Sequence, residues 1–273
     1  MRKINAVKIK DAITQLCFEA NFFLRQDVLI ALRHAFKTES KRGAKKILKA
    51  ILDNAAYAKK EKLAICQDTG MGLVFVEIGQ EVNIAGDLKA AINKGVEEGY
   101  KKYSLRNSII RDPLSRGESL FSPCIIHTDI VKGDKIKLTF LAKGFGCENK
   151  SQLKMFKPTA KIEEIKKFVV ETVCNAGPDA CPPYIVGVGI GATADYSGVL
   201  AKKALLRKIS SKSSKLEQDL LKQINKSKIG PMGLGGVNTA LAVHVQAYPT
   251  HIAGLPVSVN ISCHALRSAS VIL

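Results

Sequence analysis

The segment Ile65-Cys66-Gln67-Asp68-Thr69-Gly70-Met71-Gly72, with the apolar run Leu73 to Ile78 behind it, decides the class of fold. The first part is polar and rich in glycine, which is typical of a turn. The second is a continuous apolar run rich in β-branched residues, which predicts a buried strand. Helical periodicity dominates before this point, and helices and strands interleave after it. The sequence therefore predicts an α/β protein with a helical portion at about residues 1–60.

The helical portion contains three apolar stripes whose members are three or four residues apart. The first runs from Ile9 to Ala20. The second occupies residues 29–36 behind Asp27, a favourable capping residue. The third opens at Ser40 and continues to residue 55. We expect three helices that bury these stripes in the core.

Beyond residue 62 the patterns predict both kinds of element. Strands are expected at 73–78, 124–131, 135–141 and 184–190, and helices at 88–100, 162–173, 197–207 and 214–224. Lys132-Gly133-Asp134 lies between two of these strands and is typical of a hairpin turn. The last segment alternates short apolar strands with glycine-rich turns. No internal repeat or linker is present, so we expect one domain over residues 1–273.

Length and composition are those of a globular protein, with 273 residues of which 46% are hydrophobic. The longest apolar runs, such as Tyr184 to Ala194, are too short to span a membrane and are interrupted by glycine. The N-terminus is basic but lacks the apolar core of a signal peptide. We therefore expect a cytoplasmic protein with no membrane partner.

The net charge of +18 raises the question of a nucleic-acid partner. The excess comes mostly from lysine, with 33 residues against 9 arginines, and lysine is poorly suited to bidentate recognition of bases. Aromatic residues make up only 6% and Trp is absent, so the basic stretches lack rings for stacking. We expect a solvated basic surface, part of which attracts anionic substrates, rather than nucleic-acid binding.

Seven cysteines are scattered along the chain, an odd number at a low density that does not fit a secreted disulfide scaffold. Buried thiols, catalytic thiols and metal ligands remain open. Cys66, Cys181 and Cys263 lie in polar loops stiffened by glycine or proline, where a thiol makes a good ligand. Cys17 and Cys174 fall within or at the end of apolar helix patterns, and we expect them to be ordinary packed thiols.

The spacings between the three loop cysteines, 115 and 82 residues, exclude the close pairs of zinc fingers and ferredoxins. Spacing alone does not establish that they share a cluster. The number of ligands would decide the chemistry of such a cluster. Four thiolates block every iron and favour electron transfer, whereas three leave one iron open as a Lewis acid.

The local sequences around these cysteines resemble the cluster loops of the class I fumarate hydratases. Other segments agree with the same family in the same order, from about residue 5 to the C-terminus. The matching segments are 65–70, 105–106, 112–116, 143–150, 181–184, 233–236, 251–257 and 260–265. This resemblance implies an α/β fold with cluster ligands on loops, and a [4Fe–4S] cluster that has one open iron site. Cys66, Cys181 and Cys263 would be its ligands.

The resemblance also implies roles for residues that contact substrate. Gln67 and Asp68 match positions that contact a substrate carboxylate and support proton transfer. Arg106 would pair with a carboxylate, which suits its planar guanidinium. Gly146 belongs to a glycine-rich loop whose backbone would approach the substrate. His251 matches an active-site histidine of the family.

Two segments depart from the family pattern. Residues 117–122 replace a loop that usually reads Asn-Thr-Gly-Asp-Asn, and Phe145 and Cys147 replace a glycine and a serine. Cys147 leaves open a second interpretation, in which a fourth thiol makes the protein an iron–sulfur electron carrier or redox sensor without hydratase activity.

The chain is shorter than the single-chain members of the family and resembles the α subunit of the two-subunit form. We expect a separate β subunit that completes the active site, in a dimer of heterodimers. The expected reaction is the oxygen-sensitive, reversible hydration of fumarate to (S)-malate, a step of the tricarboxylic acid cycle. The alternative is L-tartrate dehydratase, which forms oxaloacetate from tartrate.

Overall fold

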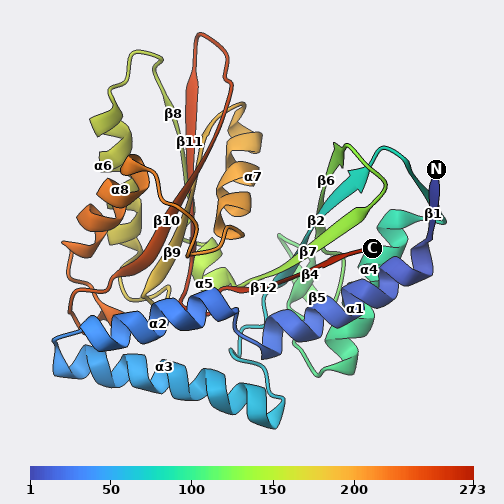
Figure 1. Ribbon diagram of the computed structural model, residues 1–273, viewed down its shortest axis with the longest axis horizontal. Helices are drawn as coiled ribbons and strands as arrows, with labels where there is room; N and C mark the ends of the chain where they lie inside the picture. Colours follow the sequence, from blue (N-terminus) through green and yellow to red (C-terminus); the bar gives the residue numbers. More distant parts are fainter. The chain divides into compact units, whose positions relative to one another are not determined.

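The computed structural model describes all 273 residues, and the chain divides into two compact units. Unit 1 contains Met1–Arg25, Ala55–Phe145 and Arg267–Leu273, and unit 2 contains Gln26–Asn54 and Gly146–Leu266. Both units mix helices with strands, which confirms the predicted α/β class (Figure 1). The chain passes between the units four times, so each unit is built from separate segments. The expectation of one domain over residues 1–273 stays a prediction.

Unit 1 is built on a four-stranded sheet in the order β12-β7-β2-β6. Its strands are β12 (Arg267–Ile272), β7 (Ile136–Lys143), β2 (Met71–Gly79) and β6 (Ile125–Val131). Strand β2 is parallel to β6 and antiparallel to β7, and β7 is antiparallel to β12. The predicted strand 73–78 is therefore confirmed as an inner strand of this sheet.

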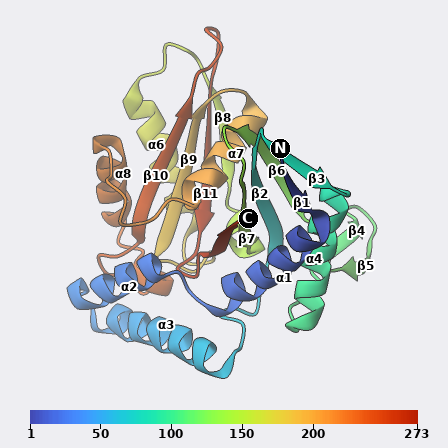
Figure 2. The same cartoon turned by 45° about the vertical axis from the view of Figure 1, so that its right-hand side comes forward.

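Helices α1 (Ala6–Phe22) and α4 (Leu88–Lys102) pack side by side in unit 1 (Figure 2). Their close approach depends on Gly95, where an added Cβ would lie 2.6 Å from the carbonyl oxygen of Lys10. The apolar side of α1 joins the sheet in one core, with Ile9, Ile13 and Phe140 fully buried. This packing confirms the first helical stripe as core. Two small sheets complete the unit, β1 (Arg2–Asn5) with β3 (Val82–Ala85) and β4 (Ile109–Asp112) with β5 (Arg116–Leu120).

The hairpin predicted around Lys132-Gly133-Asp134 is wrong. Strands β6 and β7 flank this turn as expected, but both pair with β2, which lies between them. The end of β2 takes the hydrogen bonds of the turn, since Gly79 N donates to Lys135 O (2.8 Å) and Glu81 N donates to Gly133 O (3.0 Å). A Cβ at Gly79 would lie 2.3 Å from Gly133 O, so only glycine allows this insertion.

Unit 2 is built on a second sheet in the order β10-β9-β11-β8. Its strands are β10 (Ala240–Tyr248), β9 (Tyr184–Gly191), β11 (Leu255–Ser262) and β8 (Gln152–Phe156). On one side of β9, Val186 and Val188 pack in a core with helices α6 (Ile162–Ala176) and α8 (Lys215–Asn225). On the other side, Gly187 and Gly189 admit the backbone of α7 (Ala194–Leu205), because a Cβ at either glycine would lie 2.0 Å from a carbonyl oxygen of that helix.

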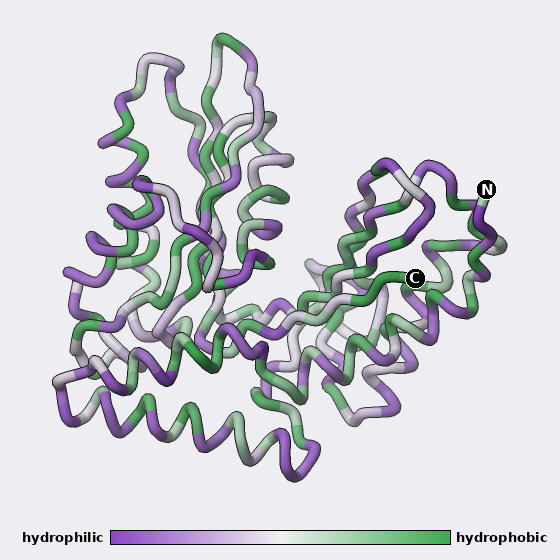
Figure 3. The backbone as a smooth tube through the Cα atoms, viewed as in Figure 1, coloured by the Kyte–Doolittle hydropathy of each residue, from purple (hydrophilic) through white to green (hydrophobic).

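Helix α2 (Gln26–Thr38) belongs to unit 2, and α3 (Arg42–Glu61) begins in unit 2 and ends in unit 1. In Figure 3, α3 alternates hydrophilic and hydrophobic residues along its length, as its predicted stripe requires. Two details of the prediction are wrong. Helix α2 begins before Asp27, whose carboxylate instead accepts a hydrogen bond from Ile209 N (2.8 Å). Helix α3 begins at Arg42 rather than at Ser40.

The other predicted helices are confirmed within a few residues as α4, α6, α7 and α8, and the predicted strands at 124–131, 135–141 and 184–190 as β6, β7 and β9. The periodicity missed the short elements β1, β3, β4, β5, β8 and α5 (Phe145–Glu148). None of these has more than five residues, too few to establish a period. No helix has both the length and the apolar character needed to cross a bilayer.

Candidate active-site loops

The loop that carries Cys66 lies in unit 1, directly before β2, and is anchored at both ends. At its start, Ile65 N donates to the carbonyl oxygen of Asn21 in α1 (2.9 Å). At its end, the hydroxyl of Tyr100 in α4 donates to Thr69 O and Gly70 O (3.0 Å each). Burial raises the pKa of Tyr100, so its hydroxyl keeps the proton that it donates. Cys66 itself stays partly exposed between these anchors.

Of the residues predicted to contact substrate, Gln67 and Asp68 lie on this loop, and Arg106 is hydrogen bonded to it. Asp68 accepts hydrogen bonds from Gly70 N at Oδ1 (3.0 Å) and from Phe145 N at Oδ2 (2.9 Å), so both oxygens are held. The backbone N of Arg106 donates to Thr69 Oγ1 (3.0 Å), and its Nη1 lies 3.5 Å from the carbonyl oxygen of Gln67. Arg106 is therefore tied to the Cys66 loop at Gln67 and Thr69, the residues on either side of Asp68.

The loop that carries Cys181 lies in unit 2 and is held through three successive carbonyl groups. Cys147 Sγ lies 3.2 Å from Ala180 O. His264 contacts Cys181 O through its backbone N (3.4 Å) and its Nδ1 (3.1 Å). Met232 N donates to the carbonyl oxygen of Pro182 (3.0 Å). Cys181 adopts a positive φ of 58°, which the anchors on both sides of it must maintain.

Cys263 follows β11 in the same unit and stands directly before His264, so the contacts of His264 tie the Cys263 loop to the Cys181 loop. Two of the three predicted ligands therefore lie on loops that are hydrogen bonded to each other. Both thiols are partly exposed. Cys66 belongs to the other unit, and no group of three His, Cys, Asp or Glu side chains forms a metal site in this structure.

Comparison with known proteins places these loops in a family. The family described as fumarate hydratase (fumerase) matches residues 10–272. The chain is 42% identical over 275 residues to a putative L(+)-tartrate dehydratase subunit alpha of Methanocaldococcus jannaschii, with 96% of each chain covered. It is 30% identical over 256 residues to the L(+)-tartrate dehydratase subunit alpha of Escherichia coli strain K12, which covers 90% of this chain and 84% of the relative.

The chain belongs to the fumarate hydratase family. The resemblance expected from the sequence is thereby confirmed, and with it the assignment to the hydro-lyases as an α-type chain.

The donor set suits the iron–sulfur cluster that this family assignment implies. The loop cysteines are partly exposed thiols on anchored backbone, whereas Cys17, Cys124 and Cys147 are buried and Cys174 is partly exposed at the end of a helix. Cys17 is fully buried, as predicted for a core thiol. Burial raises the pKa of Cys124 to about 12 and also raises the pKa of Cys174, which disfavours the thiolate that an iron requires.

The glycine-rich loop contributes differently at its two glycines. A Cβ at Gly144 would lie 3.0 Å from Asp68 Oδ2, so the protein itself leaves little room for a side chain there. A Cβ at Gly146, in unit 2, would meet no heavy atom of the protein closer than 3.8 Å. The space beside Gly146 is therefore open, which suits a close approach of a ligand to its backbone.

His251 lies away from the ligand loops of its own unit. It occupies an exposed turn between β10 and β11, where its Nδ1 accepts a hydrogen bond from Ala253 N (3.1 Å). Cys263 follows the opposite end of β11. This strand has eight residues and therefore spans about 26 Å. Within one copy of the chain, His251 does not come together with Cys181 and Cys263.

Glu39 is a buried acid that the sequence did not single out. Its Oε1 accepts from Ser40 N (3.0 Å) and Lys41 N (3.1 Å), and its Oε2 accepts from Val237 N (3.0 Å) and Asn238 Nδ2 (2.9 Å). Burial alone would raise the pKa of Glu39, but these four donors outweigh it and hold the pKa below its usual range. Glu39 thereby fixes Val237 and Asn238, which directly follow the glycine-rich segment 230–236, and Met232 of that segment anchors the Cys181 loop.

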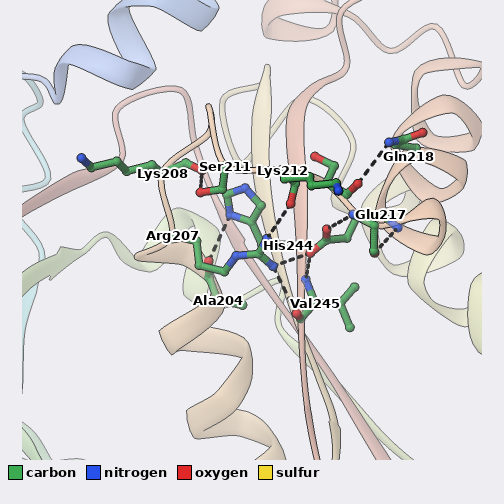
Figure 4. Close-up of polar contacts among 11 residues, drawn as sticks. Ala204, Arg207, Lys208, Ser211, Lys212, Glu217, Gln218, His244 and Val245 are labelled. Carbon is green, nitrogen blue, oxygen red and sulfur yellow. Dashed lines mark hydrogen bonds and ion pairs between the residues drawn. The ribbon is translucent and has the colours of Figure 1, made fainter.

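A second buried acid, Glu217, joins three elements of unit 2 (Figure 4). It accepts from Val245 N at Oε1 and from Ser214 N at Oε2 (2.7 Å each), and it pairs with Arg207. Burial alone would raise the pKa of Glu217, but these donors hold it below its usual range. His244 Nδ1 lies 3.1 Å from Ala204 O in the same region. Because this network joins α7, α8 and β10, we assign it a role in stability.

Proposed function

We propose that the chain is the α subunit of a [4Fe–4S]-dependent hydro-lyase that interconverts fumarate and (S)-malate. The observation that carries this proposal is the attachment of Arg106 to the Cys66 loop at Gln67 and Thr69, on either side of Asp68, in a chain of the fumarate hydratase family. A thiol beside a carboxylate, an amide and a guanidinium provides both a metal ligand and the groups that recognise a dianion.

Cys66, Cys181 and Cys263 would hold the cluster, and its open iron would supply Lewis-acid activation of the hydroxyl group that is lost or gained. The anchored loops support this assignment because contacts that orient the ligands strengthen metal binding. With three thiolate ligands the cluster would serve hydration rather than electron transfer. We assign Cys147 to packing beside Ala180 rather than to a fourth ligand position.

The residues of the chain would bind and orient the substrate. The guanidinium of Arg106 suits one carboxylate through two parallel hydrogen bonds, and the Thr69 hydroxyl fixes the backbone from which it extends. Asp68, held at both oxygens, would support proton transfer at the carbon next to the hydroxyl-bearing carbon. The open space at Gly146 would admit the substrate to the backbone of the loop.

The active site would be completed by a separate β subunit, because the relatives that match this chain nearly end to end are themselves named as α subunits. We expect the β subunit to supply the catalytic base and further basic residues. His251 would act only on a second copy of the chain, because it lies about 26 Å of strand away from Cys263 in its own copy. This arrangement favours a dimer of heterodimers.

Dehydration of L-tartrate to oxaloacetate is the second candidate, and the names of the relatives favour it. Tartrate differs from malate by one hydroxyl group, so the same carboxylate contacts would serve both substrates. The contacts of that additional hydroxyl group would decide between the two.

The test is anaerobic reconstitution of the α chain with iron and sulfide, followed by assays with fumarate and L-tartrate in the presence and absence of the β subunit. We expect about four irons per chain, negligible turnover by the α chain alone, and turnover of fumarate by the αβ enzyme. Faster turnover of L-tartrate would select the second candidate. A fully loaded αβ enzyme that turns over neither substrate, yet cycles reversibly between redox states, would replace both with the electron-carrier function.

A further inference from the structure

Arg267 is a buried cation that the assignments above do not use. It is the first residue of β12, lies four residues after Cys263 in the sequence, and has an exposed fraction of only 3%. A guanidinium remains charged at any physiological pH, and a buried charge is costly unless polar or charged neighbours compensate it. The neighbours of Arg267 in unit 1 therefore indicate what it does.

One side of the guanidinium is tied to the Cys66 loop through Asn21. Arg267 Nη1 donates to Asn21 Oδ1 (3.3 Å), and Asn21 is fully buried at the end of α1. The carbonyl oxygen of the same asparagine accepts from Ile65 N (2.9 Å), the residue before Cys66. A single residue therefore links the guanidinium to the start of the loop.

The other side of the guanidinium faces Asp68 across Gly144. A Cβ at Gly144 would lie 3.2 Å from Arg267 Nη2 and 3.0 Å from Asp68 Oδ2. Both charged groups thus border the same small space, in which a side chain would be crowded by both. No direct ion pair joins the two groups, but opposite charges on either side of one small space attract, and more strongly where water is excluded.

We propose that Arg267 is a positioning residue of the hydro-lyase site, an inference that rests on the proposed function. Held by Asn21, its guanidinium fixes the Asp68 carboxylate and the loop behind it in the orientation in which Asp68 meets the substrate. The two hydrogen bonds from Gly70 N and Phe145 N set the plane of that carboxylate, and Arg267 supplies the opposing charge on the protein side.

This role predicts a particular kinetic pattern. Arg267 is buried and borders the same space as Asp68, so its loss should misplace a group needed for turnover without removing a contact to the substrate. Misplacement of a reacting group by about 1 Å can cost about 100-fold in rate. We expect Arg267→Met to lower kcat by about 10- to 100-fold and to change KM by less than about threefold. Arg267→Lys keeps the charge and should recover part of kcat.

The experiment measures these variants in the reconstituted αβ enzyme, beside Asp68→Asn and the double variant. If Arg267 acts through Asp68, Arg267→Met should have little further effect in the Asp68→Asn background. Ser270→Ala is the matched control, because Ser270 lies on the same strand and its Oγ bonds Thr139 Oγ1 (3.0 Å) without touching Asp68. Its kcat should match the wild type. Full additivity of the two substitutions would overturn the proposal.

A second measurement does not depend on the cluster. In the full α chain without metal, Arg267→Met and Arg267→Lys should speed hydrogen exchange at the amides of Gly70 and Phe145, which Asp68 holds, and Ser270→Ala should not. Unchanged exchange in the Lys variant, together with a kcat within about threefold of wild type, would also overturn the proposal. If exchange changes as expected but the wild-type αβ enzyme turns over no substrate, the proposed function fails and the positioning contact stands.

Discussion

The Cys66 loop of unit 1 and the Cys181 loop of unit 2 are held in different ways. The first is anchored by side chains and backbone of α1 and α4, and its own polar side chains make further bonds. The second is anchored almost entirely through carbonyl oxygens, three in succession, by partners far apart in the sequence. This difference matches the groups that each loop is proposed to contribute to the active site.

At the Cys66 loop, the proposed roles require Gln67, Asp68 and the neighbouring Arg106 to be oriented as well as a thiol. Its anchors therefore include the carboxylate of Asp68 and the backbone of Arg106. On the Cys181 loop only the thiol would act, so fixing the backbone is enough. The comparison predicts that damage to the first loop impairs catalysis before cluster binding, and that damage to the second impairs cluster binding first.

The largest effect is expected from replacing the three cysteines that are proposed to bind the cluster. Cys66→Ser, Cys181→Ser or Cys263→Ser should each abolish stable binding of the cluster, whereas Cys17→Ser and Cys174→Ser should retain it. The measurement is iron and sulfide content with the absorbance of the cluster after anaerobic reconstitution. Full retention in any of the first three variants would remove that residue from the ligand set.

The next largest effect is expected from Arg106, which is hydrogen bonded to the Cys66 loop. Arg106→Lys keeps the positive charge but loses the planar fork, which should cost about 2–5 kcal/mol of transition-state stabilisation. At about 1.36 kcal/mol per factor of ten, kcat/KM should fall about 30-fold or more. The cluster absorbance should be unchanged. Kinetics within about threefold of wild type on the better of fumarate and L-tartrate would show that Arg106 is a surface charge.

A third change tests the second loop alone. His264→Ala removes the Nδ1 contact to Cys181 O and leaves the backbone contact. We expect faster loss of the cluster on exposure to a chelator, with KM changed by less than about threefold in freshly loaded enzyme. A rise in KM with normal cluster retention would reverse the assignment of the two loops.

Tyr100→Phe is the corresponding change in the first loop, and its effect should be smaller. Two carbonyl oxygens lose their shared donor, which should lower the free energy of unfolding by about 1–3 kcal/mol. kcat should fall while the iron content stays at the wild-type level. Thermal unfolding, kinetics and iron analysis of the same preparation provide the comparison with the His264 variant. Loss of iron from Tyr100→Phe without loss of stability would contradict this prediction.

The smallest effect on either loop is expected from Glu217, which contacts neither. Because its pKa is lowered in the folded state, it stabilises the fold above its unfolded pKa of about 4.3, and that contribution disappears as the pH falls through its folded pKa. Glu217→Gln should therefore be less stable than wild type at neutral pH, with the difference shrinking below about pH 4. Urea unfolding at several pH values measures this. A difference independent of pH would show that packing, not charge, is responsible.

Most of the helices and long strands could be predicted from the sequence because their apolar periods are long. Strand pairing could not. The pattern around Gly133 fits a hairpin, and the insertion of β2 depends on a contact with Gly79 some fifty residues away. Local pattern gives the elements, whereas pairing depends on which distant backbone groups meet.

The candidate site could likewise be predicted only in part from the sequence. Motif resemblance identified the cysteines, Gln67, Asp68 and Arg106, whose assigned roles stay predictions. It did not identify Asn21, Tyr100, Glu39 or Arg267, whose importance comes from what they contact. A polar residue at a helix end and an arginine in a strand are unremarkable in sequence. Only the tertiary contacts distinguish them.

The division of unit 1 into separate segments has a consequence for how the protein is made. Strand β12 follows all of unit 2 in the chain, so the ribosome must finish unit 2 before the sheet of unit 1 can gain its last strand. Until then one edge of β7 is unpaired, which is the kind of edge that promotes aggregation. Arg267 arrives with β12, so Asp68 acquires its opposing charge only in the last step of assembly.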